Sequence, residues 1–328
     1  MLTASETAPD RGPCVYGLSR EELDCLNDGD IVLLDPDGRV RCVWDVKSSS
    51  NVVMVTNLCN CHCIMCPQPS CEDEEDQLTA NIEMLKMVRP EDARNIALSG
   101  GEPTLRPDWL CALLEFCKKK FSASAVDLLT NGRRLSDFEM VRSIAVIQYP
   151  RLTWCVALHA DVATMNDDIA GTPNSFNETV KGLHNLALLR QRVEIRVVIL
   201  RQNYERLPAM AEFIYRNFPF VCHVALMGME VTGLAWRNVE RIWVDPIEYI
   251  PQLRAAVHLL RQRDVRVSIY NLPLCLLPME LWQFARDSIS DWKKGYLAQC
   301  EKCDVRKKCP GLFFTSMKQS DNIVPIAR

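Results

Sequence analysis

The chain has 328 residues, of which 48% are hydrophobic and 24% are charged, and its formal net charge is −4. This composition is typical of a globular protein with one large domain and smaller appendages. The acidic balance gives no electrostatic reason to expect a nucleic-acid partner. No apolar run approaches the roughly 20 residues of a membrane helix, and the N-terminus lacks the pattern of a secretory signal, so we expect neither a membrane protein nor a secreted one.

The cysteine content is high, with 16 cysteines in the chain. Without a secretory signal, this number favours a cytoplasmic, reducing environment in which thiols bind metals rather than form disulfides. Cys111 and Cys117 follow the apolar spacing of a helix and are expected to be small core residues.

The N-terminal segment, residues 1–50, is expected to be a small piece without a core of its own. A short helix is predicted at residues 18–26, followed by strands at 30–34 and 40–46. The sequence from Asp35 to Gly38 between these strands has the residues of a hairpin turn. Such a hairpin offers an edge for a peptide to add as a further strand.

The next segment, residues 51–235, alternates between β-branched runs and helical patterns. Strands are predicted at residues 52–55, 95–98, 124–129, 152–158, 193–200 and 221–226. Helices are predicted at residues 78–88, 109–119, 177–189 and 207–217. Alternation of this kind is typical of a parallel sheet covered by helices. Six repeats predict an α/β fold with a partial, TIM-like (β/α)6 barrel instead of a closed eight-stranded one.

A cysteine-rich loop, TNLCNCHCIMCPQP, follows the first of these strands and lies at the strand end where barrel enzymes carry their active sites. Three of its thiolates are close enough in sequence to hold three corners of one iron–sulfur cube, which leaves the fourth iron open. A zinc site is the alternative, with Cys61, His62 or Cys71 as a fourth ligand. Otherwise Cys61 is interpreted as a bystander. The predicted cluster ligands are Cys59, Cys63 and Cys66.

The spacing CxxxCxxC resembles the cluster motif of the radical S-adenosylmethionine (SAM) superfamily. The resemblance implies a [4Fe–4S] cluster whose open iron binds the amino and carboxylate groups of SAM. It also implies SAM contacts in three segments that follow strands. Glycines allow close approach of a ligand, and a neighbouring carboxylate can pair with an ammonium group. The candidate SAM-binding residues in the three segments are Gly100, Gly101, Glu102 and Pro103, then Thr130 and Asn131, then Gly228 and Met229.

A charged residue, Arg196, interrupts the apolar run at residues 193–200. If buried, it needs a partner. The carboxylate of SAM is one candidate, and an acidic residue of the core is the alternative. The sequence names no acid or base for catalysis.

The C-terminal segment, residues 236–328, contains a second group of cysteines after a predicted helix at 246–262 and a strand at 265–269. The group resembles the auxiliary-cluster regions called SPASM and twitch, although Phe313 stands where SPASM domains have a further cysteine. The resemblance therefore implies one auxiliary [4Fe–4S] cluster, and zinc is the rival because four cysteines also suit zinc. The predicted ligands are Cys275, Cys300, Cys303 and Cys309.

Several longer stretches, among them LSGGEPTL, HVALMGMEVTGLA and RVSIYNLPLC, resemble the HxsC family of radical SAM maturases of the His-Xaa-Ser system. This implies reductive cleavage of SAM to a 5′-deoxyadenosyl radical that modifies a ribosomally made precursor peptide, with oxidative cross-linking as the expected outcome. Implied partners are a precursor with His-Xaa-Ser repeats, a sister radical SAM protein, and a one-electron donor such as flavodoxin or ferredoxin. The alternatives are radical modification of a nucleobase or small metabolite, and a non-catalytic zinc or iron–sulfur binding module.

Overall fold

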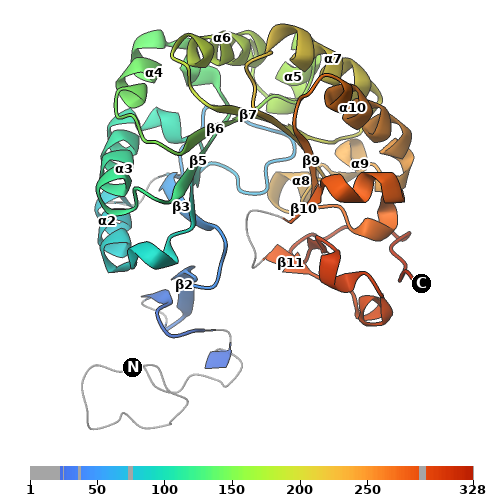
Figure 1. Cartoon of the computed structure of the whole chain (residues 1–328), viewed down its shortest axis with the longest axis horizontal. Coiled ribbons are helices and arrows are strands. Elements are labelled where there is room, and N and C mark those ends of the chain that lie inside the picture. The colour runs from blue at the N-terminus through green and yellow to red at the C-terminus, as the bar shows by residue number, and fades with distance from the viewer. Residues whose placement is uncertain (1–22, 25, 36–37, 73–76, 288–292, 328) are drawn as a thin grey trace.

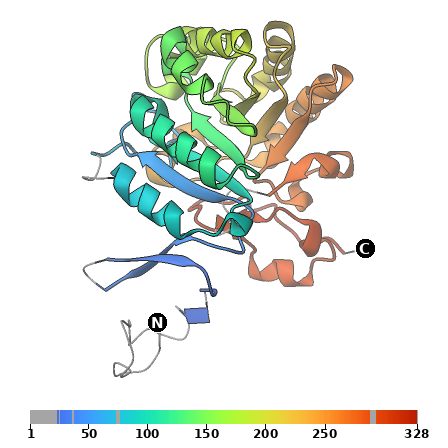
Figure 2. The ribbon, with the colours of Figure 1, turned by 60° about the vertical axis from the view of Figure 1, so that its left-hand side comes forward.

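One parallel sheet organises the molecule (Figure 1). The computed structural model describes residues 23–24, 26–35, 38–72, 77–287 and 293–327. In this part of the chain, eight strands pair in the order β10-β9-β8-β7-β6-β5-β4-β3, and each pairing is parallel. Helices cover the outer side of the curved sheet, and Figure 2 shows the same arrangement from the side. The predicted partial barrel is confirmed.

The strands alternate with helices along the chain. The strands are β3 (Asn51–Thr56), β4 (Asn95–Gly100), β5 (Ala125–Thr130), β6 (Leu152–Ala157), β7 (Val193–Val198), β8 (His223–Met227), β9 (Val267–Tyr270) and β10 (Ala285–Arg286). The helices are α2 (Gln77–Met87), α3 (Pro107–Lys120), α4 (Phe138–Ala145), α5 (Ala163–Ala170), α6 (Ser175–Leu188), α7 (Leu207–Asn217), α8 (Gly233–Arg237), α9 (Val239–Ile242) and α10 (Ile250–Gln262).

The six predicted barrel strands are present, and the count of six needs a correction because β9 and β10 extend the same sheet. The run at 265–269 was expected to be a strand of the C-terminal segment, but β9 pairs with β8. Helices α4 and α5 were not predicted. The side chain of Asp137 caps α4 by accepting hydrogen bonds from the backbone N–H groups of Glu139 and Met140, a signal that the sequence does carry.

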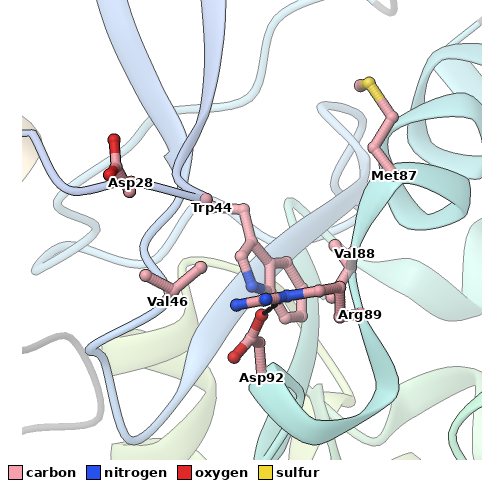
Figure 3. Close-up of a pocket in the computed structure, with 8 residues that line it drawn as sticks. Asp28, Trp44, Val46, Met87, Val88, Arg89 and Asp92 are labelled. Atoms are coloured by element: carbon pink, nitrogen blue, oxygen red, sulfur yellow. Dashed lines mark hydrogen bonds and ion pairs between the residues drawn. The ribbon is translucent and has the colours of Figure 1, made fainter.

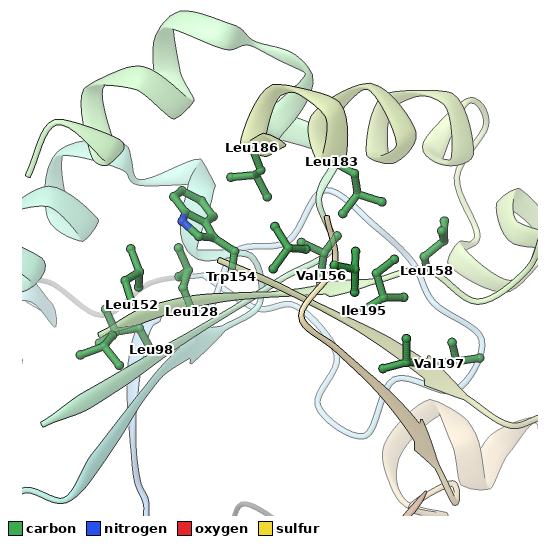
Figure 4. Close-up of a cluster of buried hydrophobic side chains, with 14 of the residues drawn as sticks. Leu98, Leu128, Leu152, Trp154, Val156, Leu158, Leu183, Leu186, Ile195 and Val197 are labelled. Carbon is green, nitrogen blue, oxygen red and sulfur yellow. The ribbon is translucent and has the colours of Figure 1, made fainter. Parts of the chain in front are cut away.

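The two faces of the sheet differ in burial. On β5, Val126 and Leu128 are fully buried beneath the helices, whereas Ala125, Asp127 and Leu129 on the other face are only half-buried. Figure 4 shows the outer core, in which Trp154 and Val156 of β6 meet Leu183 and Leu186 of α6. Successive residues of a strand point to opposite faces, so the half-buried set lines the inner face of the sheet.

The N-terminal hairpin consists of β1 (Ile31–Leu34) and β2 (Val40–Trp44), which pair antiparallel as predicted. The turn between them is closed by a hydrogen bond from the Gly38 N–H to the Asp35 carbonyl at 2.9 Å. Trp44 is 1% exposed and belongs to the main core cluster, so it attaches the hairpin to the barrel. The helix predicted at 18–26 lies mostly outside the described residues.

The C-terminal region consists of short elements next to the last strands of the sheet. It contains η6 (Leu274–Leu276), η7 (Met279–Phe284), β11 (Lys294–Gly295), η9 (Ala298–Lys302), η10 (Arg306–Lys308) and β12 (Leu312–Phe313). Lys293 and Thr315 both bind the carboxylate of Glu230, which follows β8, at 2.8 and 2.6 Å. These bonds join the region to the barrel. The domain boundary at residue 235 stays a prediction.

Candidate functional site

The cysteine loop after β3 runs across the inner side of the arc and is held from several directions (Figure 1). On one side, the Gly101 N–H donates to the Thr56 carbonyl at 2.8 Å and the Glu102 N–H to the Leu58 carbonyl at 2.7 Å. On the other side, the Ile64 N–H donates to Ile169 of α5, and the Leu234 N–H of α8 donates to Cys66. The loop is therefore positioned by elements from the whole barrel.

Close backbone contact between the cysteine loop and the turn after β4 requires glycine. A Cβ atom added to Gly101 would lie 2.2 Å from the Leu58 carbonyl oxygen. Gly171 and Gly233 contact the loop in the same way from α5 and α8, and their φ angles of +61° and +55° also favour glycine. Sequence reasoning did not single out these two glycines. The turn-like Gly-Thr-Pro after Ala170 was the available signal for the first of them.

The carboxylate of Glu102 is fully buried and hydrogen-bonded to protein donors through both oxygens. Oε1 accepts from the Thr104 hydroxyl at 2.6 Å and the Thr130 hydroxyl at 2.7 Å, and Oε2 accepts from the Asn131 N–H at 2.6 Å. Burial raises the pKa of Glu102, and these hydrogen bonds oppose the rise. We expected this carboxylate to pair with an ammonium group of a ligand. That pairing stays a prediction, and in the structure the side chain ties the turn after β4 to the turn after β5.

The turn after β5 also reaches the cysteine loop. Asn131 donates from Nδ2 to the Asn60 side chain at 2.7 Å, and the same nitrogen lies 3.9 Å from the Cys59 sulfur. Arg133 donates to the Asn60 carbonyl and is itself held by Glu178 of α6 at 2.6 Å. The structure thus brings Thr130 and Asn131 together with Gly101, Glu102 and the first predicted cluster ligand.

The thiols of the loop lie close enough to influence one another. Burial raises the pKa of Cys59 to about 11, and the charges of Glu102, Cys61 and Cys66 add to the rise. A hydrogen bond to Cys61 raises the pKa of Cys63 and lowers that of Cys61. Cys61 is thus buried beside Cys63 within the motif. Since iron binds thiolates, loading the site releases protons.

Comparison with protein families identifies the fold and its loop. The model of the radical SAM superfamily matches residues 53–214, the stretch that contains β3 to α7 and the cysteine loop. The chain belongs to the radical SAM superfamily. Members of the superfamily use a [4Fe–4S] cluster and SAM.

Individual relatives of this radical SAM chain are distant. It is 26% identical over 168 residues to the tungsten-containing aldehyde ferredoxin oxidoreductase cofactor-modifying protein of Pyrococcus furiosus, covering 49% of this chain and 46% of the relative. It is 27% identical over 283 residues to a probable GTP 3′,8-cyclase of Saccharolobus islandicus, covering 84% of each. SuiB of Streptococcus suis, solved with bound S-adenosylmethionine, superposes with a TM-score of 0.56 at 17% identity, over 70% of this chain and 51% of SuiB. The chain thus spans about half the length of the first and third of these proteins.

The residues of the radical SAM loop suit an iron–sulfur cluster. The donor set is three cysteine sulfurs, and the contacts at Gly101, Gly171 and Gly233 fix the loop backbone. Among the residues that the structure describes, no three His, Cys, Asp or Glu side chains converge on a single metal-ion position. A four-iron cube binds each sulfur through a different iron, so its ligands need not converge on one point.

The two predicted adenine contacts of the radical SAM site lie in different surroundings. Met229 packs against an apolar cluster that contains Met65. Cys63 packs against the same cluster, so Met229 borders the cysteine loop. Gly228 is buried against β9, where its N–H donates to the Tyr270 carbonyl at 2.9 Å. The role of both residues in SAM binding stays a prediction.

Arg196 is bound by protein groups on the inner face of the sheet. Its Nε donates to Glu194 at 2.6 Å, and Nη2 lies 3.4 Å from the Cys155 sulfur. These contacts match the alternative in which an acidic residue of the core is the partner. They give no support to the predicted contact with the SAM carboxylate.

The four C-terminal cysteines come together although they are up to 34 residues apart in sequence. Burial raises the pKa of Cys275 and of Cys309, and the charge of Cys300 adds to both rises. Backbone N–H groups donate to these sulfurs, from Leu274 and Gly311 to Cys309 at 3.4 Å each and from Ile326 to Cys303 at 3.5 Å. Hydrogen bonds of this type tune iron–sulfur clusters, so the group suits an auxiliary cluster.

One cavity lies away from both cysteine groups (Figure 3). It has a volume of about 370 Å³ and separates the N-terminal hairpin from the end of α2. Trp44 and Val46 line one side, and Val88, Arg89 and Asp92 line the other, with Arg89 paired to Asp92 at 2.6 Å. Because α2 ends and β3 begins here, the cavity is at the amino-terminal edge of the sheet, opposite the cysteine loop.

No helix in the described part of the chain is both long enough and apolar enough to cross a membrane.

Proposed function

We propose that this chain is a radical SAM enzyme that modifies a peptide. The observation that carries the proposal is the convergence of the cysteine loop with the turns after β4 and β5 at the carboxyl end of the sheet. Cys59, Cys63 and Cys66 would hold the catalytic cluster. When bound, the cluster and SAM supply a 5′-deoxyadenosyl radical that removes a hydrogen atom from a substrate carbon.

The residues of the chain have three tasks in this proposal. The turn from Gly100 to Pro103 brings backbone groups against the cysteine loop, where SAM would bind. Glu102 fixes that turn relative to Thr130 and Asn131. Helices α5 and α8 close the far side of the loop through Ile169 and Leu234. Together these contacts hold the loop in one geometry, which is the contribution a protein makes to cofactor chemistry.

The test is SAM cleavage by protein reconstituted with iron and sulfide under anaerobic conditions. Dithionite and SAM are expected to yield 5′-deoxyadenosine, measured by liquid chromatography. The variant Cys63→Ala should form none, whereas Cys117→Ala, which removes a buried thiol of α3, should retain the activity. Absence of 5′-deoxyadenosine from wild-type protein with intact clusters would overturn the proposal.

A peptide substrate is supported by the resemblance to the HxsC family and by the fold of SuiB, which has also been solved with its precursor peptide SuiA. The finer proposal is an HxsC-type maturase acting on a precursor with His-Xaa-Ser repeats, together with a sister radical SAM protein and an external one-electron donor. Cys275, Cys300, Cys303 and Cys309 would hold the auxiliary cluster, which supplies a site for one-electron oxidation of the product.

Modification of a nucleotide is the second candidate, because probable GTP 3′,8-cyclases match 84% of the chain. Incubation of the reconstituted protein with SAM and either GTP or a synthetic His-Ala-Ser peptide separates the two. We expect a mass change in the peptide and none in GTP. A cyclised product from GTP would replace the peptide proposal.

A further inference from the structure

Three side chains on neighbouring strands form a continuous hydrogen-bonded series on the inner face of the sheet. Glu194 of β7 and His223 of β8 are register partners, and Oε2 of Glu194 lies 2.6 Å from Nδ1 of His223. The other ring nitrogen of His223, Nε2, lies 2.9 Å from the hydroxyl oxygen of Ser268 on β9. An acid, an imidazole and a hydroxyl are thus connected in this order.

The positions of the protons follow from the charge of Glu194. Burial opposes its ionisation, but the hydrogen bond with His223 and the charge of Arg196 outweigh that cost and hold the pKa of Glu194 below its usual range. An ionised carboxylate can only accept, so Nδ1 of His223 carries a proton. In the neutral ring Nε2 is then an acceptor for the Ser268 hydroxyl. Serine–histidine–acid enzymes use the same arrangement to move a proton.

Arg196 fixes this series, and strands β4 and β5 carry further acceptors on the sheet. Arg196 holds the second oxygen of Glu194 at 2.6 Å. Asn95 of β4 donates to Asp127 of β5 at 2.9 Å, which leaves the Asn95 side-chain oxygen buried and without a hydrogen-bond partner. Burial raises the pKa of Asp127, and Arg196 is close enough to lower it in part. An unpaired acceptor next to a carboxylate suits a ligand that donates hydrogen bonds.

These groups lie on the inner face of the sheet and are mostly buried, with Ser268 5% exposed, and they have no part in the site described above. The exposed fraction is 19% for the His223 side chain and 11% for that of Glu194. Glu194 and His223 are the second and first residues of their strands, whereas the cysteine loop lies beyond the opposite strand ends. Closed barrels usually fill their interior with branched apolar side chains, and burying charge is costly. Because the series lies at the other end of the strands, support of the cysteine loop does not explain why these polar side chains are there.

We propose that Glu194, His223 and Ser268 form an acid–base site for a substrate group inside the barrel, and that Asn95 and Asp127 favour a group with N–H or O–H donors. The substrate proton passes to the Ser268 oxygen as the Ser268 proton moves to Nε2 of His223, and the Glu194 carboxylate balances the imidazolium charge. No electron moves in this step. The inference rests on the proposed function, because the substrate must reach into the barrel from the cysteine loop for this site to take its proton.

The charged and titratable groups around His223 come from several elements. Glu194 and Arg196 are on β7, Cys155 is on β6 and Asp127 is on β5. The ring of Tyr270 on β9 meets the His223 ring edge-on, with 6.4 Å between centroids. Arg192, exposed just before β7, lowers the pKa of Asp127 slightly. The immediate partner of His223 on the acid side is Glu194, so substitution of Glu194 is the most direct test.

The first measurement is the tautomer of His223, recorded by nitrogen-15 NMR on histidine-labelled, anaerobically reconstituted protein. The chain has five histidines, and the spectrum of His223→Asn assigns the resonance. We expect the neutral ring to carry its proton on Nδ1 and not on Nε2. Glu194→Gln should abolish this preference, and Ser268→Ala should shift only the Nε2 signal. Glu212→Gln, at a half-buried acid of α7, should change neither.

The second measurement titrates methylammonium chloride and, separately, sodium phosphate into the same sample. Methylammonium should shift the His223 signals of wild-type protein and shift them less in Asp127→Asn, while phosphate should have no effect. The opposite tautomer, insensitivity to Glu194→Gln, or no response to methylammonium would overturn the inference. Because 5′-deoxyadenosine is measured separately, failure of this inference and failure of the proposed function are distinguishable.

Discussion

The carboxylate of Glu102 accepts hydrogen bonds from Thr104, Thr130 and Asn131, and the residue is 0% exposed. Its contribution is to lock two strand-end turns to each other, both of which contact the cysteine loop. At the residue scale, the motif Gly-Gly-Glu-Pro therefore has two roles. Its glycine backbone packs closely against the cysteine loop, and its glutamate side chain links the turns after β4 and β5.

Substitution of Glu102 by glutamine tests this role. The amide nitrogen of glutamine would face a backbone donor, either Thr104 or Asn131, and one buried N–H would lose its acceptor. We expect destabilisation by about 1–3 kcal/mol, measured by urea unfolding. Glu115→Gln, at an exposed position on α3, is the matched control and should change stability by less than about 0.5 kcal/mol. Equal effects of the two substitutions would contradict the fastening role.

His159 follows β6, and its buried ring accepts a hydrogen bond from the Val198 N–H at 3.3 Å. Burial lowers its pKa from 6.5 to about 4. The unfolded chain therefore binds a proton between these values and the folded chain does not, so stability falls as the pH drops from about 6.5 towards 4. The loss is about 3 kcal/mol at most. His159→Gln should flatten this dependence in urea unfolding between pH 7 and 4.5, whereas replacement of the exposed His258 by glutamine should not.

At the element scale, helix α6 packs unusually close to the turn after β5. A Cβ atom added to Gly182 would lie 2.5 Å from the Cβ of Leu135 and 2.7 Å from the Gly132 carbonyl oxygen. Neither atom is at the end of a flexible side chain. This close contact positions Glu178, which holds Arg133 against the cysteine loop.

Gly182→Ala is expected to push α6 away from this turn and to cost about 1–3 kcal/mol through overpacking. Thermal unfolding measures the loss. Lys181→Ala, its exposed neighbour on the same helix, provides the control for helix propensity and should be nearly neutral. If Gly182→Ala proves as stable as the control, the close packing of α6 against Gly132 and Leu135 is contradicted.

Most elements were predictable because their sequence patterns match their surroundings. The run at residues 193–200 is β-branched, since its strand is covered on the outside by helices. Helix α5 was not predicted because Asn166, Asp167 and Asp168 interrupt its apolar pattern. The side chains of Asn166 and Asp167 accept hydrogen bonds from the backbone of neighbouring loops. Sheet membership of β9 was also not predictable, because pairing with β8 depends on tertiary packing that no local pattern records.

The sequence indicates candidate ligands for the site but not the contacts that support the cysteine loop. Spacing alone indicated Cys59, Cys63 and Cys66. The contacts of Gly171 and Gly233 with the loop join residues that are more than 100 positions apart in sequence. The series from Glu194 to Ser268 was missed for the same reason, since each of its members is an ordinary polar residue in its own strand.

At the scale of the whole molecule, two cysteine groups lie in different regions, one on the barrel and one near the C-terminus. Two four-iron clusters would give about eight iron atoms per chain. Cys303→Ala is expected to lower the iron content to about four by removing one ligand of the auxiliary group. Iron analysis of anaerobically purified protein measures this. Cys117→Ala should retain the wild-type content, and stoichiometric zinc in place of iron would show that the C-terminal site is a zinc site.

The cysteine loop is bound by Gly101 and Asn131 on one side and by Ile169 and Leu234 on the other. These anchors are spread over more than 130 residues, and long-range contacts of this kind form late in folding. In a chain still being synthesised, the cysteine loop would lack the contacts that hold its thiols in place. We therefore expect iron to be inserted after the barrel has assembled, in contrast to small zinc modules, whose metal drives their folding. Cluster occupancy would then report correct maturation of the entire chain.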